Sequence, residues 1–100
     1  MERSWRAGVV VETETADTIA DGVAVRVPVP EALADMMGLV DDVVLVDDET
    51  TRRAMELTQR HAGLIVEPAG ALGIAAILRD RERYANRRIA TILCGGNVAV

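Results

Sequence analysis

The chain has 100 residues, half of them hydrophobic and only 2% aromatic, and its formal net charge is −5 at pH 7. The hydrophobic content argues against disorder, and the negative charge argues against non-specific binding to nucleic acid or to an anionic membrane surface. No apolar stretch reaches transmembrane length, and a single cysteine excludes an internal disulfide, which fits a cytoplasmic protein.

The first segment predicts the end of a helix followed by a loop. Residues 1–8 contain good helix formers, and Gly8 is a suitable C-terminal stop. A helix that starts without a cap suggests that an upstream part of the protein precedes it. Residues 9–11 form a short β-prone run, and the polar residues 12–21 predict a loop.

Residues 30–46 predict a second helix and then a buried strand. Pro30 suits the first turn of a helix, and the apolar residues of 31–40 recur at helical spacing. Two aspartates end this pattern. The apolar run 43–46 that follows has the length of a short strand buried within a sheet.

A longer helix is predicted from Asp47 or Asp48 to about Ala62. Either aspartate is able to cap its first turn, and Glu49 lies favourably near the positive end of the helix dipole. Gly63 supplies the C-terminal stop, because glycine adopts the left-handed backbone conformation at little cost.

The segment 64–78 predicts a short apolar run and then a helix that starts at Pro68. Residues 69–78 are apolar or small at every position, which predicts burial on nearly all sides of the helix. Gly70 and Gly73 cost this helix roughly 1 kcal/mol each relative to alanine. That cost indicates close packing against another backbone or a ligand. The charged stretch that follows is typical of a solvated face.

The apolar run 89–94 predicts a strand buried on both faces, as in a parallel sheet. Ligands of open parallel sheets bind beyond the carboxyl ends of the strands, where Gly95 allows close approach to the backbone. Cys94, the last side chain of the strand, would face that crevice. The alternative is a small core residue, because free cysteines are among the most buried residues. The whole order of elements predicts one α/β unit spanning residues 1–100.

Every basic side chain is an arginine, because the sequence contains no lysine. Chemistry that needs a primary amine from a side chain is therefore impossible for this chain alone. The single cysteine and the single histidine, His61, are too few to form a structural zinc site, so no metal centre is expected.

Three segments together resemble one enzyme family. They read Thr-Ile-Ala-Asp-Gly at 18–22, Val-Glu-Pro-Ala-Gly-Ala at 66–71 and Leu-Cys-Gly-Gly-Asn at 93–97. In this order and spacing they resemble the carboxyl-terminal half of the threonine/serine dehydratase and serine racemase family. These enzymes depend on pyridoxal 5′-phosphate (PLP) and have the tryptophan-synthase-β-like fold, an α/β domain of parallel strands packed by helices. Residues 39–43 also fit, so the resemblance extends from about Trp5 onward.

The resemblance implies that Cys94, Gly95 and Glu67 bind the cofactor, with Cys94 against the pyridine nitrogen. A thiol is a weak hydrogen-bond donor that would leave this nitrogen neutral and so favour prompt β-elimination. The alternative for Glu67 is a helix cap, because free backbone N–H groups and the helix dipole favour a carboxylate there. Asp21 shapes the substrate mouth or, alternatively, only stabilises its own loop.

Parts of the family pattern are absent from this chain. The family's Schiff-base lysine, its Ser-x-Gly-Asn-His segment and its glycine-rich phosphate cradle belong to regions upstream of Thr18. Ala69 also stands where the family often has serine or threonine. The resemblance thus implies an incomplete part of a larger catalytic domain, inactive alone, whose partner is the missing amino-terminal half.

The sequence leaves three interpretations of function open. The first is the carboxyl-terminal portion of a PLP-dependent ammonia-lyase, which acts on a small hydroxy-amino acid such as threonine or serine within a homo-oligomer. The second is a standalone small α/β module for binding or regulation. The third is an expressed or proteolytic fragment of a longer protein.

Overall fold

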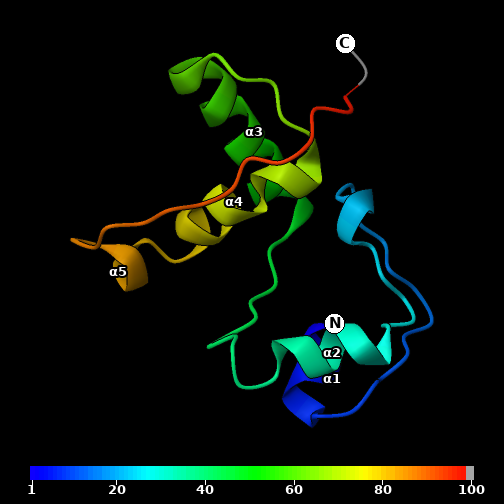
Figure 1. The fold of residues 1–100 in the computed structure, drawn as a ribbon. Coiled ribbons are helices and arrows are strands. Elements are labelled where there is room, and N and C mark those ends of the chain that lie inside the picture. The colour runs from blue at the N-terminus through cyan, green and yellow to red at the C-terminus, as the bar shows by residue number, and fades with distance from the viewer. Residues whose placement is uncertain (99–100) are drawn as a thin grey trace. The chain divides into compact units, whose positions relative to one another are not determined.

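The structure is a computed structural model that describes residues 1–98. Contacts along the chain group it into two compact units (Figure 1). Unit 1 contains residues 1–17 and 24–45, and unit 2 contains residues 18–23 and the chain from Val46 onward. Residues 18–23 therefore pack with the second half of the chain, although they precede most of unit 1 in sequence.

Unit 1 holds two short helices, α1 (Glu2–Ala7) and α2 (Pro30–Met36). Gly8 ends α1 in the left-handed region at φ 72°, and proline occupies the first turn of α2, as predicted. The predicted length of α2 is wrong. The helix stops early because the chain turns at Gly38, where φ is 82°, and this leaves Leu39 82% exposed.

The Ser4 side chain holds the β-prone run 9–11 against α1 through hydrogen bonds. Its side chain is fully buried, and its Oγ accepts a hydrogen bond from Val11 N at 2.8 Å and donates one to Val11 O at 3.3 Å. These bonds satisfy both backbone groups of Val11 without a neighbouring strand.

Unit 2 is built on α3 (Asp48–Ala62), which packs against the 3-10 turn η2 (Pro68–Ala71) and against α4 (Leu72–Arg79) (Figure 1). The bounds of α3 are as predicted, and Gly63 ends it at φ 68°. Small side chains bring the helices close together. The buried core consists of Ala54, Val66, Ala71 and Ala75.

The helix predicted over 69–78 is less buried than expected. It begins as the 3-10 turn η2 before α4, and only Gly70, Ala71 and Ala75 within it are buried. The prediction of burial on nearly all sides is therefore wrong for the described chain. The contacts that cover the helix come mainly from α3 and from the segment that ends at Cys94, so its other sides stay partly exposed.

The predicted strands at 43–46 and 89–94 are also wrong as elements of this chain, because residues 1–98 contain no strand. A strand needs a hydrogen-bonded neighbour, and residues 89–94 make no backbone–backbone hydrogen bond among the described residues. They run as extended chain beside α4 (Figure 1). Ile92 is 83% exposed, which contradicts burial on both faces.

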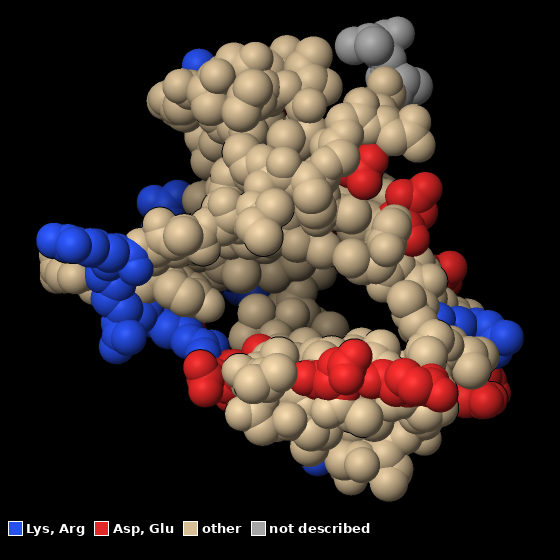
Figure 2. Space-filling model, in the orientation of Figure 1, with Lys and Arg blue, Asp and Glu red and all other residues tan. Residues whose placement is uncertain are grey.

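The charged segment after α4 is exposed, as predicted. It contains the short helix α5 (Arg81–Tyr84), and Figure 2 shows arginine side chains gathered over this part of unit 2. Among the described residues, no helix has both the length and the apolar character needed to cross a membrane.

Asp47, the residue before α3, is the N-cap of this helix. Its carboxylate accepts hydrogen bonds from Thr50 N at 2.7 Å and from Thr50 Oγ1 at 2.8 Å. These bonds, the backbone one first, hold the pKa of Asp47 below its ordinary value of 3.8. A carboxyl group whose pKa is lowered by folding stabilises the fold above its unfolded pKa, and the contribution is lost as the pH falls through the folded pKa.

We expect Asp47→Asn to remove this pH dependence from α3. The amide keeps an oxygen that accepts from Thr50 N, so the cap persists, but it has no proton to gain in acid. Far-UV circular dichroism between about pH 5 and pH 2 should show a smaller acid-induced loss of helix in the variant than in the unchanged chain. Identical acid profiles for the two proteins would contradict the prediction.

Candidate functional site

The three motif segments come together in unit 2, although they are far apart in sequence. The 3-10 turn η1 (Asp21–Val23) packs against η2. A Cβ atom built on Gly22 would lie 3.1 Å from Ala69 Cβ and 3.8 Å from Glu67 Oε1. The first motif therefore meets the start of η2 so closely that a glycine is the residue best suited to the contact.

Glu67 joins η2 to the third motif through two hydrogen bonds. Its N–H donates to Gly95 O at 3.1 Å, and its Oε2 accepts from Asn97 N at 3.0 Å. Glu67 lies at the N-cap position of η2, but its side chain makes no capping hydrogen bond. The helix-cap interpretation of this carboxylate is therefore wrong, because the carboxylate binds the loop after Cys94 instead.

Gly95 needs to be a glycine for two reasons. Its φ is +81°, in the left-handed region that disfavours residues with a Cβ atom. A Cβ atom at this position would also overlap the Glu67 carboxyl group. The two hydrogen bonds and this close approach hold three residues together: Glu67, Gly95 and Asn97. We call this group the Glu67 clamp.

Gly70 and Gly73 allow the chain before Gly95 to lie directly on η2 and α4. A Cβ atom on Gly70 would overlap Cys94 O, and one on Gly73 would overlap the Thr91 side chain. The close packing predicted from these two glycines is confirmed, and the packed neighbour is the segment that carries Cys94.

Cys94 is exposed in the described chain. Leu93 beside it is partly buried against the core of unit 2, so adjacent side chains of this segment differ in exposure. The interpretation of Cys94 as a core residue is therefore wrong. Its assignment to a ligand crevice stays a prediction.

Asp21 is also exposed, at the start of η1 and one residue before the glycine that meets η2. The residue that anchors this loop is Asp48, which the sequence did not single out for this role. Asp48 Oδ1 accepts hydrogen bonds from Thr18 Oγ1 at 2.7 Å and from Ile19 N at 3.2 Å. The sequence did contain a signal for this role of Asp48. Two aspartates stand side by side at the start of α3, and only one of them, Asp47, is needed as the cap.

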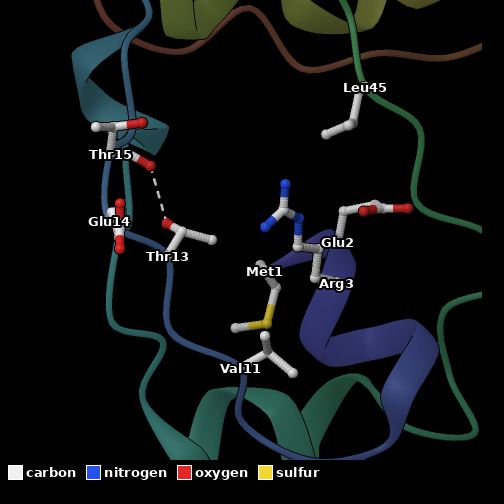
Figure 3. A pocket seen from close by; sticks show the side chains of 8 residues that line it. All are labelled: Met1, Glu2, Arg3, Val11, Thr13, Glu14, Thr15 and Leu45. Carbon is white, nitrogen blue, oxygen red and sulfur yellow. Dashed lines mark hydrogen bonds between the residues drawn. The ribbon is translucent and has the colours of Figure 1, made fainter.

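A pocket of about 490 Å³ lies in unit 1 (Figure 3). Figure 3 shows the Arg3 guanidinium extending into it, and Thr13 Oγ1 in its wall donates a hydrogen bond to Thr15 O at 2.9 Å. None of the predicted site residues lines this pocket, and all of them belong to unit 2.

The sequence matches, over residues 1–95, the protein family described as pyridoxal-phosphate dependent enzyme. The chain belongs to this family. It is 35% identical over 97 residues to the L-threonine ammonia-lyase of Geobacter sulfurreducens, a match that covers 97% of this chain and 24% of the relative. It is 32% identical over 99 residues to the serine racemase of Schizosaccharomyces pombe, covering 99% of this chain and 31% of the relative.

Solved structures of a threonine deaminase and a serine racemase have folds similar to that of this chain. A threonine deaminase from the organism abbreviated T.th. matches with a TM-score of 0.90 and 31% identity, over 99% of this chain and 33% of that one. The serine racemase of maize matches with a TM-score of 0.88 and 33% identity, over 99% of this chain and 31% of that one. These matches confirm the predicted family and fold class, and the chain spans 24% to 33% of the length of these proteins.

Proposed function

We propose that this chain is the carboxyl-terminal portion of a PLP-dependent ammonia-lyase that acts by β-elimination on a small hydroxy-amino acid. The observation that carries the proposal is the convergence of the three motif segments on Glu67. Relatives whose names specify this chemistry support it, among them the L-threonine ammonia-lyase above and the L-threo-3-hydroxyaspartate ammonia-lyase of Saccharomyces cerevisiae, which is 32% identical over 97 residues.

Cys94, Gly95 and Glu67 are the residues of this chain that would hold the cofactor. The arrangement fits a planar ring on one side, because Gly95 has no side chain to prevent close approach and the Cys94 thiol is exposed next to it. Asn97 N holds the Glu67 carboxylate in place at 3.0 Å. The bound cofactor supplies the electron sink for the bond that breaks at the α-carbon.

The Cys94 thiol would set the electronic character of the ring. As a neutral, weak donor it suits an unprotonated pyridine nitrogen, whereas a carboxylate partner would hold that nitrogen protonated. A neutral ring withdraws electrons less strongly, which favours fast elimination over racemisation and transamination. Asp21, on the loop that meets Glu67 through Gly22, would contribute to the mouth through which substrate enters.

The remaining catalytic parts would come from a partner segment. Because the chain contains no lysine, we propose that an amino-terminal portion of the same catalytic domain supplies it, together with the phosphate-binding residues. Residues 1–100, with both units, would then be one part of that larger cytoplasmic domain. The 100-residue chain alone would be inactive.

Joining this chain to the amino-terminal portion of the Geobacter relative tests the proposed function. We expect the fusion to take up PLP and to form a 2-oxo acid from threonine, serine or 3-hydroxyaspartate, with the preferred substrate read from the rates. A folded, PLP-loaded fusion that forms no 2-oxo acid from any of these would overturn the proposal.

The chain by itself provides the control. With no lysine, we expect it to form no borohydride-reducible adduct of PLP on any side chain, apart from slow reaction at the terminal α-amino group. Mass spectrometry after reduction and proteolysis locates any adduct. A stoichiometric adduct at an internal residue would contradict this expectation.

We also propose that the protein acts as a homo-oligomer, and we expect the isolated chain to self-associate. Large apolar side chains are exposed in both units, and contiguous exposed apolar surface promotes association. Ile92→Glu should lower the apparent mass in light scattering without changing the circular dichroism, because Ile92 is one of the most exposed of these side chains. A monomer at high concentration would instead favour the standalone-module interpretation.

A further inference from the structure

Two adjacent aspartates at the start of α3 have different tasks. Asp47 caps the helix through Thr50, as described above. Asp48 lies in the first turn, and its carboxylate instead crosses to residues that are 29 and 30 positions away in sequence. A single oxygen, Oδ1, accepts both the Thr18 hydroxyl at 2.7 Å and the Ile19 amide at 3.2 Å.

The hydrogen bonds continue from Asp48 through the first motif. Thr18 Oγ1 donates to Asp48 and at the same time accepts from Ala20 N at 3.1 Å. Ala20 is 1% exposed, and its carbonyl oxygen accepts from Val23 N at 3.0 Å to close the turn η1. The first residues of the loop are therefore anchored by the Asp48 carboxylate, which lies on a 15-residue helix. Charge-assisted hydrogen bonds of this kind are roughly twice as strong as neutral ones.

The other end of the same loop meets the Glu67 clamp. A Cβ atom on Gly22 would be tightly packed against Ala69 Cβ at 3.1 Å and in ordinary contact with Glu67 Oε1 at 3.8 Å. Asp21 lies between the anchored Ala20 and this contact, so its position follows from both ends of the loop.

We propose that Asp48 is a positioning residue of the substrate mouth: it holds residues 18–23 against the Glu67 clamp and thereby places Asp21. This inference rests on the proposed function, in which Asp21 lies at the substrate side of the site. Asp48 acts through Thr18 and Ile19, and it touches neither substrate nor cofactor.

The first test reads the loop directly by amide hydrogen exchange of the chain. Asp48→Ala should raise exchange at residues 19–23 by about tenfold, the loss expected when hydrogen bonds to a charged group are removed. Asp47→Ala is the matched control, since it weakens the same helix terminus but leaves the loop bonds in place. Thr18→Val keeps the side-chain shape and should reproduce the effect of Asp48→Ala. Unchanged loop exchange in Asp48→Ala, or an equal increase in Asp47→Ala, would overturn the inference.

The second test measures catalysis in the active fusion. A misplaced mouth should raise KM about tenfold and change kcat little, since binding is lost before chemistry begins. Asp48→Asn should rescue most of the effect, because its carbonyl oxygen is able to accept both bonds. An Asp48→Ala enzyme with the KM of the parent would overturn the inference, as would a loss of kcat shared equally with Asp47→Ala. Failure of the proposed function is distinguishable, because the fusion would then be inactive while the exchange result at residues 19–23 still stands.

Discussion

Gly95→Ala is expected to destabilise the site strongly, whereas Gly96→Ala, one residue later, is expected to be nearly silent. Gly95 has φ +81°, and a side chain in the left-handed region costs about 1–2 kcal/mol. Its new methyl group would also overlap the Glu67 carboxyl group, so this side chain would rotate away and lose its hydrogen bond from Asn97 N, at a cost of about 1 kcal/mol. At Gly96 the nearest atom to an added Cβ is Ile65 O at 3.5 Å, an ordinary contact.

A third glycine separates the two contributions to this loss. Gly63 has a similar φ of +68°, but nothing lies within 4 Å of a Cβ built there. Gly63→Ala should therefore lose only the backbone contribution, and the difference between the two variants measures the clash with Glu67. Urea denaturation followed by circular dichroism supplies the free energies of unfolding. If Gly95→Ala costs no more than Gly63→Ala, the Glu67 clamp does not exist in solution.

The ends of α1 and α3 were predictable because their signals are local. Gly8 and Gly63 end α1 and α3 in the left-handed conformation, and an aspartate caps α3, all within one turn of the residues concerned. Gly70 and Gly73 also predicted a close approach correctly, because a helix tolerates two costly glycines where something lies against them.

The strand predictions were wrong because a strand depends on a neighbour that is distant in sequence. The apolar run 89–94 has strand composition, but a strand is defined by hydrogen bonds to a neighbour, and this run makes none among residues 1–98. Solved relatives about three times as long share the fold of this chain, and the strand composition of 89–94 fits their α/β class.

The motifs identified segments that meet in unit 2, but they did not predict the hydrogen bonds that connect these segments. The resemblance placed Glu67, Gly95 and Cys94 at the cofactor, and the local alternative for the Glu67 carboxylate was a cap on its own helix start. Instead, the backbone N–H of Asn97, 30 residues away, donates a hydrogen bond to the Glu67 carboxylate. Asp48 was likewise one of two candidates for the cap of α3, and it binds Thr18 instead. In both cases a carboxylate met two possible donors, and only the tertiary fold decides between near and distant ones.

Substitution of Cys94 is expected to change which reaction follows in the active fusion. Cys94→Ser keeps a small neutral donor and should retain elimination within about tenfold, or roughly 1.4 kcal/mol in the barrier. Cys94→Asp places a carboxylate where the thiol lies, and this charge would stabilise a protonated pyridine nitrogen. The stronger electron sink should lower elimination and increase racemisation and transamination. Cys94→Ala would remove the proposed partner of the nitrogen and should weaken PLP binding modestly.

Folding of the aspartate variant is measured in the fusion itself, because a carboxylate that replaces a buried core residue would unfold the protein. Circular dichroism confirms folding, and the ratio of 2-oxo acid to racemised and transaminated product is then measured for each variant. Ile92→Ser is the matched control, because it alters another side chain of the same segment outside the proposed site. A folded Cys94→Asp enzyme whose product ratio equals that of the parent would remove Cys94 from the cofactor site.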